Sequence, residues 1–271
     1  MNFIKTPLQK AESAIAEADA VLIGAGAGLS TAAGINYSGP EFEKAFADMI
    51  ARYGFTDLYT SSFYPFQSEE EKWAYWSRHI DYARFLPEGK PLYKHLLELV
   101  QGKEYFVITT NVDGQFAKSG FDPDKVFEVQ GDYGLMQCAT ACHPKRYSNE
   151  SLVKQMVAEQ QDCHIPSALV PRCPVCGGPM EINVRKDRYF VEDDRWHLQA
   201  DRYYSFLEKS LGKRKLVLLE YGVGYNTPTI IRFPFERMAA SYPDVTLIRI
   251  NKDYRDSQTP GIRHFIGLDT L

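Results

Sequence analysis

Four short apolar runs, each followed by a glycine-rich or polar segment, place the strongest constraint on how this chain can fold. The runs cover 20–23, 104–109, 215–220 and 245–250. Continuous apolar runs of this length are typical of parallel strands that are buried on both faces. In an open α/β sheet, ligands bind beyond the carboxyl ends of such strands. We therefore predict an α/β fold with a Rossmann-like, doubly wound parallel sheet, whose ligand site lies in the segments after these runs.

The composition argues against several other classes of protein. The chain has 271 residues, of which 44% are hydrophobic and 24% charged, and its net charge is −4. A nucleic-acid surface is expected to be basic, so we expect no nucleic-acid partner. No apolar run reaches the length of about 18 residues that a transmembrane helix needs, and the N-terminus lacks a signal-peptide pattern. We expect no membrane association and a cytoplasmic location.

Helical patterns fill the gaps between the apolar runs, at 41–53, 69–84, 91–101 and 194–211. We predict one domain over residues 1–271 with two insertions. Residues 36–90 are rich in aromatic side chains and show no strand pattern, which predicts a helical insertion. Its aromatic residues either pack the core of that segment or line a substrate groove. Residues 132–190 contain the cysteines and form the second predicted insertion, a small zinc-binding module.

The first apolar run ends in a glycine-rich loop that contains Gly24, Gly26 and Gly28. Glycines allow the backbone to approach a pyrophosphate closely, and a following helix attracts its charge. The loop does not match the G-x-G-x-x-G pattern, because Leu29 and Thr31 stand where the third glycine would be required. No G-K-[ST] follows, which excludes a Walker loop. On these residues alone, the loop is either a phosphate cradle or a tight turn.

The segments after the four runs resemble the motifs of the sirtuin family. Residues 26–35 (GAGLSTAAGI) look like the first sirtuin motif, which holds the NAD pyrophosphate, and residues 110–114 (TNVDG) look like the second, which faces the nicotinamide ribose and carboxamide. Residues 222–224 and 250–251 stand where sirtuins contact adenosine. The resemblance implies that the cofactor is NAD and that its contacts are Gly26, Ala27, Gly28, Ser30, Gly34, Ile35, Thr110, Asn111, Val112, Asp113, Gln130, Gly222, Val223, Gly224, Asn251, Lys252 and Asp253.

Two departures from the typical sirtuin pattern indicate a subgroup. Residues 36–39 (NYSG) replace the usual Pro-Asp-Phe-Arg, and Gln130-Gly131 replaces the catalytic His-Gly. Both departures are similar to the macrodomain-linked microbial sirtuins, also called class M. This resemblance implies protein ADP-ribosyltransferase activity, a lipoyl-carrier protein of the glycine-cleavage H type as acceptor, and a macrodomain hydrolase that removes the modification. Asn36 and Tyr37 are further candidate contacts of the cofactor.

The glutamine at position 130 distinguishes between possible reactions. Sirtuin deacylation needs a base that takes a proton from a ribose hydroxyl, and histidine titrates in the required range. A glutamine amide forms hydrogen bonds but does not titrate there. Transfer of ADP-ribose to a nucleophilic acceptor needs no such base, so we predict Asn111, Asp113 and Gln130 as the catalytic residues of a transferase. The alternatives are an NAD-dependent deacylase and an inert sensor of NAD or ADP-ribose.

The cysteines indicate a structural metal site. Cys138 and Cys142 form one close pair, and Cys173 and Cys176 form a second pair in a Pro/Gly-rich segment. Two such pairs resemble the four-cysteine zinc site of sirtuins, in which thiolates bind Zn²⁺ tetrahedrally. The three residues between the first two cysteines, where two are usual, leave an empty or differently ligated site open. The candidate substitute ligands are Cys163, His143 and His164.

Overall fold

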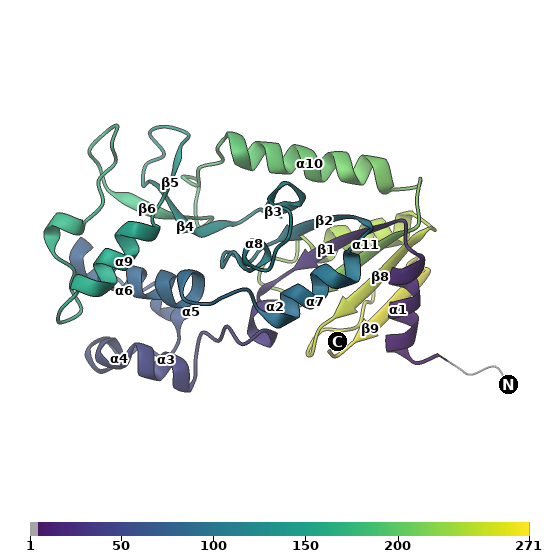
Figure 1. The fold of residues 1–271 in the computed structure, drawn as a ribbon, viewed down its shortest axis with the longest axis horizontal. Helices are drawn as coiled ribbons and strands as arrows, with labels where there is room; N and C mark the ends of the chain where they lie inside the picture. The colour runs from purple at the N-terminus through teal and green to yellow at the C-terminus, as the bar shows by residue number, and fades with distance from the viewer. Residues whose placement is uncertain (1–4, 271) are drawn as a thin grey trace.

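In the computed structural model, which describes residues 5–270, a six-stranded parallel sheet is the larger of two sheets (Figure 1). The strand order is β3-β2-β1-β7-β8-β9, and every neighbouring pair is parallel. This is the order of the Rossmann fold, with its switch point between β1 and β7. The four predicted runs are confirmed as central strands; the strands are β1 (Ala20–Ala25), β2 (Glu104–Thr109), β3 (Val126–Glu128), β7 (Leu216–Tyr221), β8 (Val245–Ile250) and β9 (His264–Leu268).

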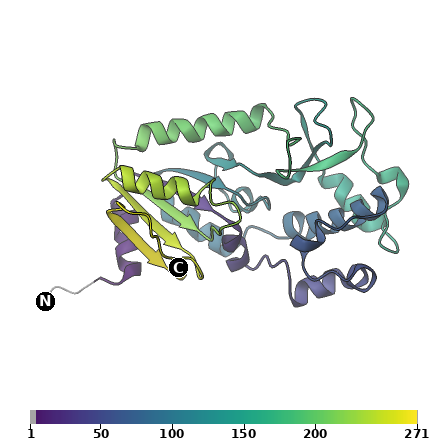
Figure 2. The same cartoon turned by 180° about the vertical axis from the view of Figure 1, so that it is seen from behind.

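Helices cover both faces of this sheet, as Figures 1 and 2 show from opposite sides. On one face, Val21 and Ile23 of β1 pack in a core with residues of α1 (Pro7–Glu17) and α7 (Pro91–Val100). On the other, Ala20 and Leu22 pack with α10 (Asp194–Ser210) and α11 (Arg232–Ser241). Alternate residues of a strand point to opposite faces, so a strand covered on both faces must be apolar throughout. The predicted doubly wound sheet is confirmed.

The aromatic segment after the first motif is helical, but its helices are shorter than predicted. A single helix over 41–53 was the wrong prediction, because the chain breaks at Phe46 (φ −122°). The predicted helix over 69–84 is α-helical only to Ile80 and then continues as a π-helix. The elements are α3 (Pro40–Ala45), α4 (Ala47–Tyr53), α5 (Leu58–Ser61), α6 (Glu69–Ile80) and the π-helix η1 (Asp81–Phe85).

The cysteine-containing segment forms a small antiparallel sheet of order β5-β4-β6, which the sequence patterns did not indicate. Its residues share one core with the aromatic helices: Val153 and Met156 of the segment cluster with Trp73 and Tyr75. Most aromatic side chains of residues 36–90 therefore pack a core. The elements of this segment are β4 (Gly131–Cys138), β5 (Arg146–Ser148), α9 (Glu150–Glu159), η3 (Ser167–Leu169) and β6 (Met180–Val184). Two further short helices, α8 (Gln115–Lys118) and η2 (Pro123–Lys125), lie between β2 and β3 in the chain.

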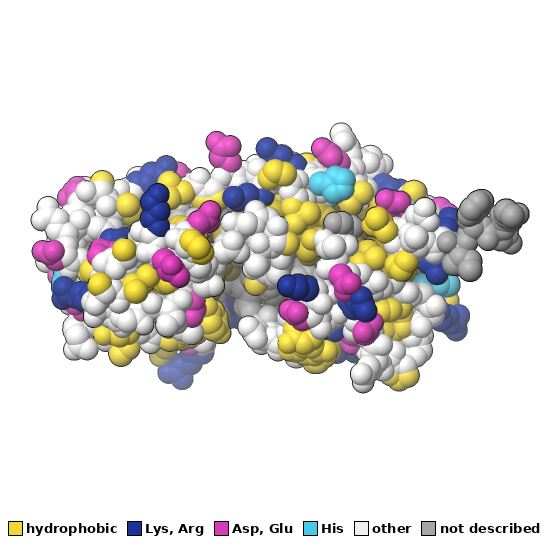
Figure 3. Space-filling model, turned by 90° about the horizontal axis from the view of Figure 1, so that it is seen from below, with side chains coloured by type: hydrophobic (Ala, Val, Ile, Leu, Met, Phe, Trp, Pro, Cys, Tyr) yellow, Lys and Arg dark blue, Asp and Glu magenta, His cyan; other side chains and the backbone are white. Residues whose placement is uncertain are grey.

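The surface carries charges of both signs. Figure 3 shows Lys and Arg side chains intermixed with Asp and Glu across the face seen there, which agrees with the small net charge of −4. Among residues 5–270, no helix combines the length and the apolar character that crossing a bilayer would require.

His79 lies at the centre of the core that the two insertions share. Its ring stacks on Trp76 at 5.0 Å between centroids and meets the edge of Tyr133, also at 5.0 Å. The Tyr75 hydroxyl donates to the Leu58 carbonyl oxygen (2.6 Å), so it accepts from Nδ1–H of His79 (3.0 Å). Burial lowers the pKa of His79 to about 3, because a charged ring would lose its hydration.

This buried histidine predicts a loss of stability in mild acid. The folded state favours the neutral ring. The contribution of His79 to the free energy of unfolding is therefore fully present above the unfolded-state pKa of about 6.5 and decreases as the pH falls toward 3. Between pH 7 and pH 5 the linkage amounts to about 2 kcal/mol. We expect the free energy of unfolding of His79→Gln, measured in urea, to change by about 2 kcal/mol less between pH 7 and pH 5 than that of the wild type. Equal pH dependence in the variant and the wild type would contradict this assignment.

Candidate active site

The glycine loop after β1 lies in direct backbone contact with the loop after β7. The Gly28 amide donates to the Gly222 carbonyl oxygen at 2.9 Å. A Cβ atom at Gly26 would lie 2.6 Å from that oxygen, and one at Gly28 would lie 2.7 Å from the Gly222 Cα atom. Gly222 also has a positive φ of +64°, which other residues rarely adopt. The glycines are therefore needed for the close approach of two loops, whatever ligand they bind. The short helix α2 (Ala27–Ala32) follows the first loop.

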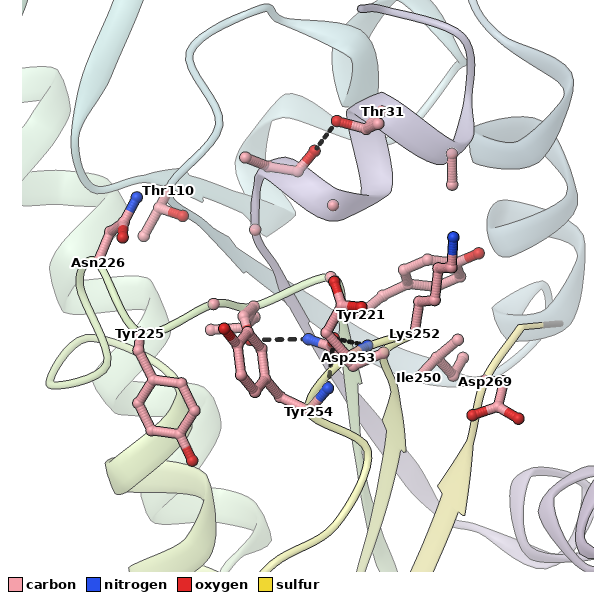
Figure 4. Close-up of a pocket in the computed structure, with 18 of the residues that line it drawn as sticks. Thr31, Thr110, Tyr221, Tyr225, Asn226, Ile250, Lys252, Asp253, Tyr254 and Asp269 are labelled. Carbon is pink, nitrogen blue, oxygen red and sulfur yellow. Dashed lines mark hydrogen bonds between the residues drawn. The ribbon is translucent and has the colours of Figure 1, made fainter. Parts of the chain in front are cut away.

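A cavity of about 850 Å³ opens at the carboxyl ends of the central strands, between these loops and the segment after β8. Figure 4 shows side chains from the segments after β1, β2, β7 and β8 around it. The predicted cofactor contacts that line the cavity are Gly26, Ala27, Gly28, Thr110, Gly222, Val223, Gly224, Asn251, Lys252 and Asp253. Residues that line it without having been predicted include Thr31, Tyr221, Tyr225, Asn226, Tyr254 and Asp269.

The Asn251 side chain organises one wall of this cavity. Its Nδ2 atom donates to the Val223 carbonyl oxygen at 3.0 Å, and its Oδ1 atom accepts from the amides of Asp253 (3.1 Å) and Tyr254 (3.0 Å). This residue thus connects the segments after β7 and β8. Tyr225 and Tyr254 meet edge to face at 4.9 Å, and both rings are about half exposed at the rim.

A buried ion-pair network lies below this wall. Glu220 accepts two hydrogen bonds from Arg249, at 2.7 and 2.9 Å, and Arg249 also donates to Glu236 at 2.8 Å. Burial raises the pKa of Glu220, and the charge and hydrogen bonds of Arg249 oppose that rise. Arg232 extends the network to the Tyr254 carbonyl oxygen (3.1 Å). The two glutamates, for which the sequence suggested no role, hold the segments that line the cavity.

A second polar group lies beside the cavity and joins the first two motifs. The Asn111 amide nitrogen is 3.0 Å from both the Gly26 carbonyl oxygen and Ser30 Oγ. Ser30 in turn donates to Asp113 at 2.5 Å. Burial raises the pKa of the Asp113 carboxyl, and the Ser30 hydrogen bond opposes the rise. The Tyr93 hydroxyl lies 2.9 Å from Ser30 Oγ and 3.2 Å from the Asn111 amide nitrogen.

Tyr93 is a member of this group that the sequence did not reveal. The helical pattern over 91–101 predicted its helix, but a helix pattern does not show which loop a side chain meets. Ser30, Asn111, Asp113 and Gln130 do not line the cavity, and neither do three further predicted contacts: Ile35 is buried, Gly34 has a positive φ of +84°, and Val112 packs against the core of the insertions. Tyr37 is half-buried; burial raises the pKa of its hydroxyl, and Tyr133 and then Asp113 add to the rise.

Gln130 follows β3 and carries an unsatisfied polar atom. Its Oε1 atom is buried and has no hydrogen-bond partner among residues 5–270. A buried carbonyl oxygen without a donor is costly, and such atoms are normally paired with water or with a ligand. The Gln130 amide therefore fits a ligand that offers a hydroxyl hydrogen, as a ribose does. Gln130 does not line the 850 Å³ cavity; its unpaired oxygen, taken together with the glycine loops that do, fits a dinucleotide such as NAD.

The four predicted metal ligands come together at one end of the small sheet. The sulfur atoms of Cys138, Cys142, Cys173 and Cys176 lie within 4.8 Å of one another, and none forms a disulfide. The pairs 138–176 and 142–173 are 3.7 and 3.6 Å apart. Four thiolates at about 2.3 Å from Zn²⁺ in a tetrahedron have this spacing. Cys163 lies elsewhere, with its sulfur 3.6 Å from Asp48, whereas His143 lies beside the cluster, with its Nδ1 atom 3.0 Å from Cys142 Sγ.

Comparisons with known proteins agree with this arrangement. The profile of the Sir2 family matches residues 26–200. The chain is 42% identical to a protein of Staphylococcus aureus strain Mu50 named "Protein ADP-ribosyltransferase", over 89% of this chain and 76% of that protein. It is also 32% identical to a "Probable bifunctional ADP-ribose hydrolase/ADP-ribosyltransferase" of Fusarium oxysporum f. sp. cubense, over 90% of this chain and 42% of that protein.

Solved structures show the same fold at lower sequence identity. A Sir2 homologue mutant in complex with 2'-O-acetyl ADP ribose superposes with a TM-score of 0.59 at 18% identity, covering 95% of this chain and 90% of the other. A Sir2 homologue in complex with NAD has a TM-score of 0.56 at 18% identity, covering 94% and 86%. With the family profile spanning both the glycine loop and the cysteine cluster, the chain belongs to the Sir2 family, the sirtuins.

Proposed function

We propose that the chain is an NAD-dependent protein mono-ADP-ribosyltransferase. Two observations carry this proposal together. Asn111 and Asp113 belong to one buried hydrogen-bonded group through Ser30. Separately, the buried Oε1 atom of Gln130 lacks a partner among residues 5–270. Sir2 family enzymes use NAD, and the relatives at 42% and 32% identity have names that include ADP-ribosyl transfer. NAD supplies ADP-ribose when its bond to nicotinamide breaks and an acceptor oxygen bonds to the ribose carbon.

The residues around the cavity have distinct roles in this proposal. Gly26 to Gly28 hold the pyrophosphate, and Gly222 to Gly224 together with Asn251 and its neighbours hold the adenosine end. Asn111 orients the nicotinamide ribose, and Asp113 fixes the carboxamide. Gln130 accepts a hydrogen bond from a ribose hydroxyl without removing its proton. Orientation and fixed dipoles of this kind are major contributions to catalysis.

The acceptor that we propose is a lipoyl-carrier protein of the glycine-cleavage H type, which attacks through a carboxylate that is already nucleophilic. This part of the proposal depends on the resemblance of residues 36–39 and Gln130 to the macrodomain-linked sirtuins. The name of the Fusarium relative, which includes ADP-ribose hydrolase, supports a macrodomain-type hydrolase as functional counterpart. The free cysteines fit a reducing compartment, and we propose a cytoplasmic location.

Replacing Asn111 tests the proposed catalytic group. We expect Asn111→Ala to lower kcat by about a hundredfold or more, because the ribose loses its orienting amide. Asn251→Ala, at the other end of the cavity, should mainly raise the KM for NAD. Mass spectrometry of the carrier protein after incubation with NAD measures both effects, and a thermal melt controls for folding. Wild-type turnover by Asn111→Ala would contradict the assignment.

The role of Gln130 separates the transferase from the deacylase and the sensor. We expect Gln130→Ala to retain transfer at about one tenth of the wild-type rate, because it loses one hydrogen bond and no base. An acetyl-lysine peptide incubated with wild-type enzyme and NAD should remain acetylated. NAD-dependent loss of the acetyl group would favour the deacylase. Tight NAD binding in calorimetry without nicotinamide release, with the carrier present, would favour the sensor.

We propose that the four clustered cysteines bind one structural zinc ion. Thiolate binding of Zn²⁺ stabilises small modules, so we expect Cys173→Ser to lose the metal and to lower the melting temperature. Cys163→Ser is the matched control, because its sulfur faces Asp48 outside the cluster. Elemental analysis and thermal melts should show one zinc ion per chain in the wild type and in the control. Wild-type protein without zinc, purified in the absence of chelator, would refute the site.

A further inference from the structure

A partly buried ion pair connects the aromatic helices to the segment that carries Gln130. Arg84 Nε donates to Asp132 Oδ1 at 2.7 Å, and Arg84 Nη2 donates to Oδ2 at 3.0 Å. The two side chains are 17% and 12% exposed, and both line a second, smaller cavity of about 330 Å³. This bidentate geometry fixes direction as well as distance. Asp132 is only two residues after Gln130, and Arg84 does not line the 850 Å³ cavity.

The same guanidinium packs against the segment that carries Asp113. A Cβ atom at Gly114 would lie 2.2 Å from Arg84 Cζ, and Gly114 has a positive φ of +64°. Glycine at position 114 thus brings the arginine into contact with the backbone directly after Asp113. The positive charge of Arg84 opposes the rise that burial causes in the pKa of Asp113. Arg84 is therefore in contact with both catalytic segments at once.

Further hydrogen bonds close this arrangement. The Tyr133 amide donates to the Val112 carbonyl oxygen at 2.9 Å, which joins the two segments directly. Asp132 Oδ1 also accepts from the Gly134 amide at 2.7 Å. From the other side, the Lys118 ammonium group bonds the carbonyl oxygens of residues 84, 85 and 87. Both the side chain and the backbone of Arg84 are held.

The π-helix explains how Arg84 reaches this position. The Leu86 amide donates to the Asp81 carbonyl oxygen at 2.8 Å, which is the i→i+5 bond of a π turn. One extra residue in a turn rotates the side chains that follow by about 100° relative to an α-helix. Arg84 lies inside this turn, so its direction depends on the irregularity. Single π turns within α-helices are frequent at functional sites.

We propose that Arg84 is a positioning residue, which acts through Asp132 to hold Gln130 against the segment that carries Asp113. This inference rests on the proposed function and extends it to Arg84, which does not line the 850 Å³ cavity and is not one of the predicted cofactor contacts. The pair sets the geometry of the reacting end of the site, whereas Asn251 and the glycine loops hold the other end. Loss of Arg84 should consequently impair turnover more than NAD binding.

Kinetics and hydrogen–deuterium exchange on the full-length protein test this role. We expect Arg84→Met to lower kcat for carrier modification by about tenfold or more, with the KM for NAD within about threefold of the wild type. The peptide that covers residues 130–134 should exchange faster. Arg84→Lys keeps the charge but not the bidentate bond, so its kcat and its exchange rate should lie between those of the wild type and those of Arg84→Met. Arg202→Met, which removes the exposed partner of Asp124, is the matched control and should change none of these readouts.

A double variant separates positioning from simple stabilisation. Arg84→Met leaves Asp132 buried without its partner, and Arg84→Met/Asp132→Asn removes that charge. We expect the double variant to regain thermal stability but not turnover. Recovery of kcat together with stability, or unchanged kcat and exchange in Arg84→Met, would overturn the proposal. If the wild type forms no product, the proposed function fails. In that case, faster exchange of residues 130–134 in Arg84→Met would still support the positioning role. Unchanged exchange of these residues would overturn it.

Discussion

The contact between two glycine-containing loops at the switch point of the sheet is the constraint on which the candidate site depends. A Cβ atom at Gly26, Gly28 or Gly222 would lie between 2.3 and 2.7 Å from backbone atoms of the opposite loop. The loops after β1 and β7 can therefore approach this closely only because glycines stand at these positions. This approach brings the ends of the central strands together, and the cavity of about 850 Å³ lies across them.

Polar interactions then fix one wall of that cavity and the group beside it in different ways. At one end, the buried network of Glu220, Arg249 and Glu236 supports the wall that Asn251 organises. Beside the cavity, Asn111 donates to the Gly26 carbonyl oxygen, Ser30 of α2 donates to Asp113, and the Arg84–Asp132 pair connects this group to the segment of Gln130. The helical insertion and the small sheet are thus joined beside the candidate site, because Arg84 belongs to the first and Asp132 to the second.

The central sheet and most of the candidate site could be predicted from the sequence, because buried strands and glycine loops leave local patterns. The edge strand β3 has three residues and β9 is partly exposed, so neither forms a continuous buried run. The small sheet was missed because its strands pair across sequence gaps that hydrophobic periodicity does not detect. Tyr93 and Arg84 were missed for a related reason: their partners lie on other elements, and a π turn has no clear sequence signature.

The central claim is that ADP-ribose leaves NAD and becomes attached to a protein acceptor without a histidine base. The most direct test follows both halves of NAD at once, with one label in the adenylate and a second in nicotinamide, in the presence of lipoylated or unlipoylated carrier protein. The account predicts that the adenylate label becomes bound to the carrier while an equal amount of nicotinamide label appears in solution. Nicotinamide release without adenylate label on any protein, or no release at all, would contradict it.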